Sequence, residues 1–183
     1  MINQSRYHPK NRLIEYFKEK GKVKEIKSSD CLVHVGEKCN KAFFILNGGF
    51  ICQDYNEDND KLRTINFHLK DFHPIMTVVH SFYSDLASNC QLRAIAKSEV
   101  LEVKKSTFLT DVEKDKALKE AYIEETIYAL LAINEFHTRL ITLDTKAMYR
   151  YLQEKCPIVV QNIPAKYIAE FMGVSAEWLS RIR

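Results

Sequence analysis

Residues 166–183 read Lys166-Tyr-Ile-Ala-Glu-Phe-Met-Gly-Val-Ser-Ala-Glu-Trp-Leu-Ser-Arg-Ile-Arg183, and this stretch decides the fold that we expect. Ala169 is small, as two closely crossing helices require, and Gly173 stands four residues later, where the first helix must end with a positive φ. Ser175 suits the N-cap of a second helix because its hydroxyl can accept an unpaired backbone N–H. The apolar seam between the two helices consists of Ile168, Phe171, Met172, Val174, Leu179 and Ile182. This pattern is typical of a helix-turn-helix, whose second helix can enter the major groove of DNA.

The second helix of this motif presents side chains that suit contact with bases. Arginine can read guanine edges, and glutamate can accept a hydrogen bond from cytosine N4. The outward positions are Ala176, Glu177, Ser180, Arg181 and Arg183. The same spacing also occurs in helical hairpins that bind nothing, so a compact C-terminal helix pair is the alternative interpretation.

Composition sets the broad class of the protein. A chain of 183 residues, 46% of them apolar, can bury cores in one large domain or two small ones. The net charge of +3 is only mildly basic. Basic residues outnumber acidic ones from residue 139 onward, as contact with phosphates requires.

Cysteines, histidines and apolar runs exclude several kinds of site. The five cysteines are odd in number and lack a Cys-x-x-Cys pair, which indicates reduced thiols and no zinc, iron–sulfur or disulfide framework. The histidines lack metal-ligand spacing, and no nucleophile–base motif is present, so we expect no metal, no cofactor and no enzyme activity. Without a signal core or an apolar run of about 18 residues, the sequence predicts a cytoplasmic protein with no membrane segment.

Short alternating segments follow an amphipathic helix that we expect within residues 3–20. Strands are predicted at 31–35, 41–46 and 50–55, with a hairpin at Asn47-Gly-Gly49. Further strands are predicted around residues 64–69 and 100–103. In the first of these, Ile65, Phe67 and Leu69 should share one face, and Thr64, Asn66 and His68 the other. Many short strands separated by turns indicate an antiparallel sandwich or barrel.

A long helical pattern runs from about Asp111 to Leu143, and it carries two apolar seams. The first seam consists of Ile123, Ile127, Leu130, Asn134, His137 and Ile141. The second consists of Tyr122, Thr126, Ala129, Ile133, Phe136, Leu140 and Leu143. One seam could cover the β-domain while the other pairs with a partner helix, or the whole stripe could pack inside a single chain. Asp144-Thr145 then predicts a break and the N-cap of the next helix.

With this order of elements, the chain resembles the Crp/Fnr family of bacterial transcription regulators, related to the cyclic-AMP receptor protein. It looks most like the short members found in Bacteroidetes, and the resemblance covers nearly the whole chain. The matching motifs are Gly36-Glu37, Phe43-Phe-Ile-Leu-Asn-Gly48, Ser98-Glu-Val-Leu-Glu-Val103 and Ile163-Pro-Ala-Lys-Tyr-Ile-Ala-Glu-Phe-Met-Gly-Val-Ser175.

The resemblance implies an α+β fold in three parts. Residues 1–110 would form an N-terminal helix and an effector-sensing antiparallel β-roll (jelly roll) of the cyclic-nucleotide-binding type. Residues 111–143 would form a long dimerisation helix, and residues 144–183 the helix-turn-helix DNA-binding domain. Family members normally continue with a β-hairpin wing, whereas this sequence stops at Arg183.

The resemblance also implies the partners of the protein. These are a second copy, a palindromic DNA operator and, as a further candidate, RNA polymerase, with no membrane partner. Glu177 and Arg181 match the base-contacting residues of the family, and Ala176 stands where the family often has an arginine. Lys166, Ser175 and Ser180 are candidate phosphate contacts.

The segments that match the nucleotide pocket of the family depart from its pattern. The family has a Phe-Gly-Glu segment, whose glutamate takes the ribose, and a later arginine that takes the phosphate. Here His73 and Pro74 replace the glycine and glutamate, Ser88 replaces the arginine, and Arg93 falls on the opposite strand face. The corresponding pocket residues are Phe72, His73, Pro74, Ile75, Ser88, Asn89 and Cys90.

Two hypotheses about function follow. The first is a DNA-binding transcription regulator whose β-roll senses an unknown effector. This effector would not be cyclic AMP, because the arginine that would bind the phosphate of the nucleotide is replaced by Ser88. The pocket would then be structural filler or a site for an apolar or neutral effector. The alternative is a ligand-binding or protein-interaction module whose helix-turn-helix no longer binds DNA.

Overall fold

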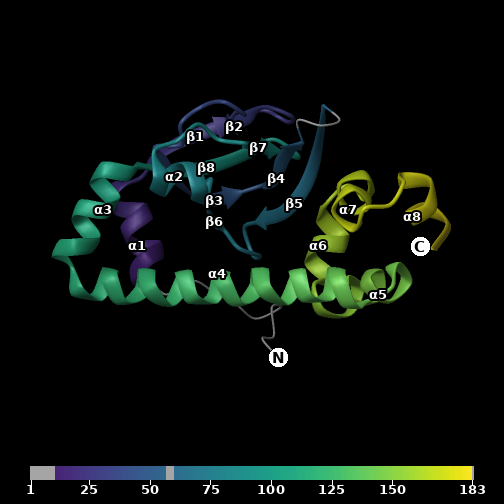
Figure 1. Ribbon diagram of the computed structural model, residues 1–183. Helices are drawn as coiled ribbons and strands as arrows, with labels where there is room; N and C mark the ends of the chain where they lie inside the picture. Colours follow the sequence, from purple (N-terminus) through teal and green to yellow (C-terminus); the bar gives the residue numbers. More distant parts are fainter. Residues whose placement is uncertain (1–10, 57–59, 183) are drawn as a thin grey trace.

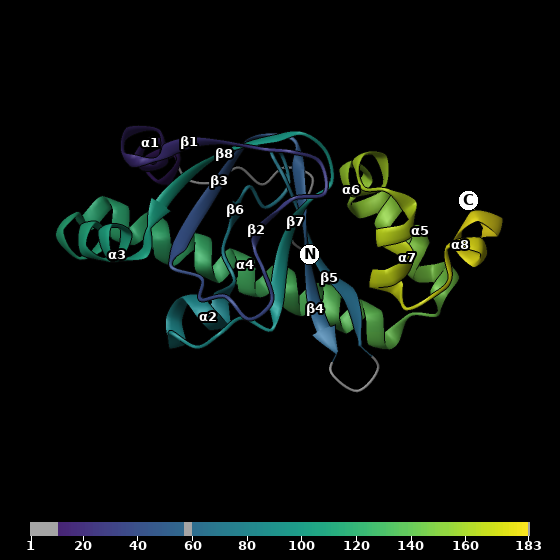
Figure 2. The same ribbon diagram turned by 90° about the horizontal axis from the view of Figure 1, so that it is seen from above.

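The structure is a computed structural model that describes residues 11–56 and 60–182. Two four-stranded antiparallel sheets form a β-roll, and the long helix α4 (Lys116–Thr142) runs beneath it (Figure 1). Helices α1 (Asn11–Lys20) and α3 (Lys105–Lys114) lie at one end of α4, and the C-terminal helices lie at the other (Figure 2). The predicted α+β fold, with a β-roll, a long helix and a C-terminal helix-turn-helix, is therefore confirmed.

The strands divide between two sheets, named here after one strand of each. The β1 sheet has the order β1-β8-β3-β6, with bounds Lys22–Ile26, Ser98–Lys104, Lys41–Asn47 and Ile75–Met76. The β4 sheet has the order β2-β7-β4-β5, with bounds Cys31–Val33, Cys90–Ala94, Gly49–Asn56 and Lys61–Leu69. The remaining helices are α2 (Val79–Ser84), α5 (Thr145–Lys155), α6 (Pro157–Asn162), α7 (Ala165–Met172) and α8 (Ala176–Ile182).

Two clusters of buried apolar side chains hold these elements together. The first fills the β-roll and reaches α1, α3 and the start of α4, and it includes Phe17, Phe50 and Leu118. The second lies between the other face of the β4 sheet, the end of α4 and helices α5–α8, and it includes Phe67 and Phe136. Burying one large apolar side chain stabilises a fold by about 1.5–3 kcal/mol. The C-terminal helices are therefore packed on the β-roll and not merely tethered to it.

The turn at Gly48 departs from the sequence prediction. We expected a hairpin at Asn47-Gly-Gly49, but β3 pairs with β6 and β8, whereas β4 pairs with β5 and β7. Gly48 has a φ of +83° and takes the chain from one sheet to the other. A Cβ on Gly48 would lie 2.8 Å from the Cα of Ser98, so this crossing requires glycine. The hairpin prediction is wrong because turn chemistry predicts a chain reversal but not the sheet that the next strand joins.

The two faces of β5 also differ from the predicted alternation. Cys52 and Gln53 of β4 pair with Asn66 and Thr64, so Ile65 is an extra residue that forms a bulge in β5. As a result, Thr64 is 1% exposed whereas Ile65 is 47% exposed. The prediction that Ile65 shares one face with Phe67 and Leu69 is therefore wrong, because Ile65 lies on the same side of the sheet as Asn66 and His68.

The predicted helix over residues 111–143 is broken at Asp115, so that α3 ends before α4 begins. The Asp115 carboxylate caps α4 by accepting a hydrogen bond from the backbone N–H of Leu118 at 3.0 Å. It also accepts a hydrogen bond from Nη2 of Arg12 at 2.6 Å, which ties the start of α4 to α1. The second predicted break is present as well, because Asp144 caps α5 through the N–H of Ala147.

Helix α4 has the two-sided character that its seams predict. The first seam is exposed, and the solvent-exposed fractions of its aliphatic members Ile123, Ile127, Leu130 and Ile141 range from 46% to 69%. Most of the second seam turns toward the β-roll, and Leu140 and Leu143 pack against the second apolar cluster. In the described part of the chain, no helix combines the length and apolarity needed to cross a membrane.

Candidate functional site

The C-terminal helix pair has the turn that its sequence predicts. Gly173 ends α7 with a φ of +72°, and the N–H of Val174 donates to the carbonyl of Ala169 at 3.0 Å. Ser175 Oγ accepts a hydrogen bond from the backbone N–H of Trp178 at 3.1 Å and so caps α8. Leu179 is fully buried between the helices. These contacts fix the direction in which α8 leaves the turn.

The outward face of α8 is open to solvent. Glu177 and Arg181 lie one helical turn apart on this face, and their side chains are exposed. Hydrogen bonds from its own backbone N–H and from Ser175 lower the pKa of Glu177, so it presents a carboxylate at neutral pH. The other exposed candidates are Lys166, Ser175, Ala176 and Ser180, and Arg183 lies outside the described residues.

Helix α7 is docked on the β4 sheet through a buried polar cluster. The Glu170 carboxylate accepts hydrogen bonds from Nε2 of Gln53 at 3.0 Å and from Oγ1 of Thr64 at 2.7 Å. Gln53 in turn accepts a hydrogen bond from Gln91 at 2.9 Å, which extends the cluster to β7. The rings of Phe67 and Phe171 pack beside it with centroids 4.9 Å apart. The helix-turn-helix is thus oriented by specific contacts with the β-roll.

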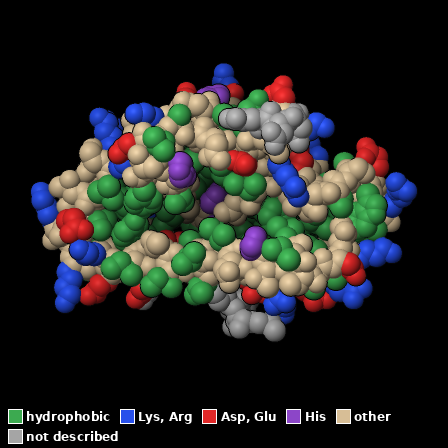
Figure 3. Space-filling view, viewed as in Figure 1, with side chains coloured by type: hydrophobic (Ala, Val, Ile, Leu, Met, Phe, Trp, Pro, Cys, Tyr) green, Lys and Arg blue, Asp and Glu red, His purple; other side chains and the backbone are tan. Residues whose placement is uncertain are grey.

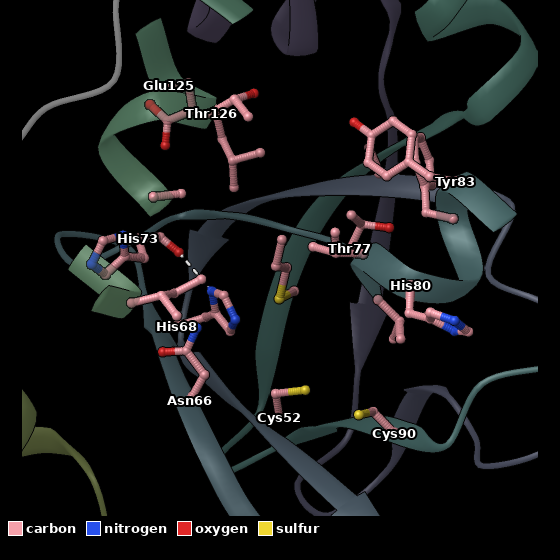
Figure 4. Close-up of a pocket in the computed structure, with 18 of the residues that line it drawn as sticks. Cys52, Asn66, His68, His73, Thr77, His80, Tyr83, Cys90, Glu125 and Thr126 are labelled. Carbon is pink, nitrogen blue, oxygen red and sulfur yellow. Dashed lines mark hydrogen bonds between the residues drawn. The ribbon is translucent and has the colours of Figure 1, made fainter. Parts of the chain in front are cut away.

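A cavity of about 590 Å³ lies between the β-roll and α4. Figure 3 shows a hollow above α4, walled mainly by hydrophobic side chains with histidines among them. The α4 wall is formed by Tyr122, Glu125, Thr126, Ala129, Ala132, Ile133 and Phe136. Figure 4 shows Glu125 and Thr126 on the helix side, across from Asn66 and His68 of β5 and Cys52 of β4. The volume is sufficient for a small-molecule ligand.

The titratable groups in the cavity wall are shifted by burial. His68 and His73 have pKa values lowered to about 4 and about 3, mainly by desolvation, so both are neutral at pH 7. Nδ1 of His68 is 3.0 Å from the backbone oxygen of His73, to which it donates. Burial raises the pKa of Glu125 to about 7. The described wall contains no lysine or arginine side chain.

The Cys90 thiol at this site is poorly suited to nucleophilic chemistry. Cys52 and Cys90 both line the cavity on neighbouring strands (Figure 4). The neighbouring Cys52, burial and Asp54 together raise the pKa of Cys90 far above its ordinary value. Since the thiolate is the reactive form, Cys90 is protonated at neutral pH and acts as a packed apolar side chain.

Comparison with solved structures identifies this arrangement. FixK2 from Bradyrhizobium japonicum matches with a TM-score of 0.72 at 13% identity, over 88% of this chain and 82% of that one. A CooA mutant from Carboxydothermus hydrogenoformans matches with a TM-score of 0.70 at 12% identity, over 98% and 84%. The c-di-GMP responsive regulator CLP of Xanthomonas campestris matches with a TM-score of 0.66 at 16% identity, over 93% and 88%. All three are regulators of the Crp/Fnr family.

The chain has the Crp/Fnr fold. No protein-family model and no curated protein sequence matches it. At identities of 12–16%, the likeness concerns the fold, so the roles of individual residues must be argued from this chain itself.

Within the Crp/Fnr fold, the seven pocket residues expected from the sequence separate into two groups. The cavity wall brings together His73, Ile75, Asn89 and Cys90. Phe72, Pro74 and Ser88 are buried but do not line the cavity. The ring of Phe72 packs against Phe136, and Ser88 Oγ donates to the backbone oxygen of Cys90 at 2.6 Å. Arg93 is also absent from the described wall, in agreement with its expected orientation.

Glu125 is one of several wall residues that the sequence pattern did not place in the pocket. Read alone, the pair Glu124-Glu125 resembles an ordinary solvated helix surface. The signal was the helical spacing, because Glu125 falls in register with the buried positions Leu118, Ala121, Ala132 and Phe136. A carboxylate on a buried stripe is uncommon unless it is paired or functional.

Proposed function

We propose that this protein is a homodimeric, DNA-binding transcription regulator that senses a ligand in the cavity between its β-roll and α4. The observation that carries the proposal is the exposed face of α8, with Glu177 and Arg181, held at a capped helix-turn-helix on the Crp/Fnr fold. CLP, which has the same fold, is described as a global regulator that links cell–cell signalling to virulence gene expression.

The proposed roles follow the three parts of the chain. Residues 1–110 sense the ligand, residues 111–143 associate two protomers, and residues 144–183 bind DNA. Glu177 and Arg181 read base edges in the major groove. Lys166, Ser175 and Ser180, together with Arg183, contact the phosphate backbone and set the position of α8. Ala176 offers no hydrogen bond to a base.

The exposed seam of α4 supports the proposal of a dimer. Ile123, Ile127, Leu130 and Ile141 form an apolar row along a 27-residue helix. A contiguous apolar surface of this kind favours association, and pairing with a second α4 would cover it. Two-fold symmetry would then place two copies of α8 about 34 Å apart, on successive major grooves of a palindromic operator.

The position of the cavity supports coupling between ligand and DNA. Cys52 and Asp54 of β4 line the cavity, whereas Gln53 between them binds Glu170 of α7. One strand therefore separates the ligand space from the helix-turn-helix. Phe136 provides a second link, because it lines the cavity and its ring lies 5.7 Å from that of Phe171. A ligand with different affinities for two arrangements of these contacts would shift the orientation of α7.

The charge of the cavity wall argues against cyclic AMP as the ligand. A cyclic nucleotide brings a buried phosphate, which requires a cationic side chain or unpaired backbone donors. The described wall offers the carboxyl groups of Asp54 and Glu125 and no lysine or arginine. We therefore expect no heat of binding when the protein is titrated with cyclic AMP or cyclic GMP at micromolar concentrations.

DNA binding can be tested without knowledge of the target genes. Duplexes selected from a random pool by the purified protein would be footprinted at about 50 mM and about 200 mM salt. We expect a palindromic protected site with half-sites one helical turn apart, and protection that weakens at the higher salt.

The outcome that would contradict this proposal is equally specific. A folded dimer that selects no sequence and binds DNA weakly at both salt concentrations would favour the alternative. The protein would then be a ligand-binding or protein-interaction module whose helix-turn-helix does not bind DNA. Candidate contacts with RNA polymerase would be sought only after a specific operator has been found.

A further inference from the structure

The polar groups of the cavity wall are strongly asymmetric in charge. Its acids are Asp54 and Glu125, and its described residues include no lysine or arginine. The buried histidines His68 and His73 do not supply positive charge, because desolvation keeps both neutral at pH 7. Apart from the exposed His80, which also lines the cavity, the described wall offers a ligand no side chain that could carry positive charge.

The two acids differ in whether the protein satisfies them. Asp54 Oδ1 accepts a hydrogen bond from Nδ2 of Asn89 at 2.6 Å and another from Sγ of Cys90 at 3.3 Å. Glu125 is only 9% exposed, and its Oε2 has no hydrogen-bond partner in the described part of the chain. Burying a carboxylate without a donor is costly, so the position is best satisfied by a donor from outside the protein.

Much of the rest of the wall is apolar, and several aromatic rings contribute to it. Phe82, Phe108, Tyr122 and Phe136 contribute rings, and aliphatic side chains such as Ile75 fill the spaces between them. A cavity of about 590 Å³ with such walls accommodates a ring system or a short hydrocarbon chain. Aromatic rings also stabilise a nearby cation through their negative faces.

We propose that the cavity binds an apolar amine, whose protonated nitrogen donates to the Glu125 carboxylate while its hydrocarbon part packs among the aromatic side chains of the wall. This inference rests on the proposed function, in which the same cavity is the effector site. An apolar carboxylate or phosphate is disfavoured because it would be buried beside Asp54 and Glu125, and the described wall has no lysine or arginine to pair with it.

The test compares ligands that share a tail and differ in their head group. One series is tryptamine, tryptophol and indole-3-propionate, and the other is octylamine, octanol and octanoate. Each is titrated into the full-length protein by calorimetry. Within each series we expect the amine to bind about tenfold or more tightly than the alcohol, and the carboxylate to bind most weakly. Equal affinities, a preference for the carboxylate or the absence of binding by both amines would overturn the proposal.

Two matched variants assign the preference to its residue. Glu125→Gln removes the charge from the cavity wall, and it should abolish the preference for amines while leaving the affinity for the alcohols within about twofold. Glu124→Gln removes the same charge from the adjacent exposed position and should change neither. An amine preference that survives Glu125→Gln would show that another group binds the nitrogen. Circular dichroism of each variant confirms that it is folded.

The test of the ligand class is independent of the test of DNA binding, because calorimetry with these ligands uses no DNA. A protein that prefers amines but selects no operator would refute regulation and leave the ligand class intact. A protein that selects an operator but shows no preference for amines would refute the ligand class and leave the proposed regulation intact.

Discussion

Glu125 occupies the α4 wall of the cavity, and the fold keeps its side chain from water without giving Oε2 a donor. Its raised pKa of about 7 is the electrostatic result of that burial. The same burial makes the residue unfavourable for stability whenever it is ionised in the ligand-free protein. Residues retained at a cost in stability are often functional, and this cost can be measured.

Glu125→Gln should stabilise the free protein at high pH. The pKa of Glu125 rises from about 4.5 in the unfolded chain to about 7 in the fold, so the folded state binds the proton more tightly. The contribution of Glu125 to stability is therefore most favourable below pH 4.5 and is lost as the pH rises through 7. We expect the variant to exceed the wild type by at most about 3 kcal/mol in unfolding free energy at pH 8, with no difference at pH 4. Urea unfolding at several pH values measures this.

The control for this comparison is Glu124→Gln. Its unfolding free energy should differ little from that of the wild type, and the difference should not grow between pH 4 and pH 8. The buried histidines His68 and His73 act in the opposite sense. Because burial lowers their pKa values, they reduce the stability of the protein as the pH falls below 6.5. Their contribution is common to all variants and cancels in the differences. A constant gap between Glu125→Gln and the wild type from pH 4 to 8 would mean that Glu125 is not the titrating group.

Arg181→Ala should weaken specific DNA binding by about 1–3 kcal/mol if Arg181 reads a base, and it should relax the sequence preference at one position of each half-site. Lys166→Ala serves as the comparison. A phosphate contact should weaken binding equally for all sequences and lower the slope of affinity against salt by about one. Titration of selected and mismatched duplexes at several salt concentrations separates the two effects. An unchanged sequence preference in Arg181→Ala would remove it from base reading.

At the scale of elements, the contact between α7 and the β4 sheet determines how the helix-turn-helix is presented. It combines the contact between the tilted rings of Phe67 and Phe171 with a polar cluster in which the Glu170 carboxylate accepts hydrogen bonds from two side chains. The apolar part supplies most of the stabilisation, whereas the hydrogen bonds to Glu170 specify one orientation of the helix.

Thr64→Val should destabilise the fold by about 1–3 kcal/mol, because it removes a donor from the Glu170 carboxylate within a buried cluster. The similar size of the two side chains excludes a large cavity as the cause. The matched control is Thr110→Val, an exposed position on α3, for which we expect a change within about 0.5 kcal/mol. Urea unfolding at equal protein concentration gives both values. Equal effects of the two substitutions would show that the cluster contributes no specific stability.

The elements also show where sequence reasoning succeeds. The helix-turn-helix was predictable because its signals are local, since Gly173 and Ser175 act within one turn of their own position. The two seams of α4 were predictable because helical periodicity assigns faces without knowledge of the partner. In both cases, the feature depends on residues that are neighbours in the sequence.

The failures have a common physical cause in contacts between distant segments. The sheet that β4 joins depends on pairing with β5 and β7, which the turn at Gly48 does not specify. The faces of β5 depend on the bulge at Ile65, which arises in the pairing of β5 with β4. The burial of Glu125 depends on the β-roll covering that side of α4, so the adjacent Glu124 and Glu125 have different environments. Phe72, Pro74 and Ser88 were placed in the pocket by motif position, but they do not line the cavity.

At the scale of the whole molecule, the exposed seam of α4 is an apolar surface that nothing in the described structure covers. Leu130 lies near its centre and is 65% exposed. Leu130→Glu should place like charges opposite each other across a paired helix and abolish the dimer. We expect the mass in solution, measured by light scattering, to fall from that of two protomers to that of one.

Val23→Glu provides the control, because Val23 is 61% exposed on the edge strand β1 and away from α4. It should leave the mass unchanged. If Leu130→Glu remains a dimer, the protomers associate through another surface. If the unmodified protein is a monomer even with selected DNA, the proposed spacing of the two copies of α8 fails with it.

The same apolar row has a consequence for measurements of heat stability. If the two long helices cover each other only in the pair, then assembly stabilises the folded protomers, and the melting midpoint must rise as the sample is concentrated. Dilution to nanomolar levels would therefore unfold a fraction of the protein at temperatures where a concentrated sample is intact. A cell that makes few copies would hold this protein nearer to its unfolding threshold than a purified stock suggests.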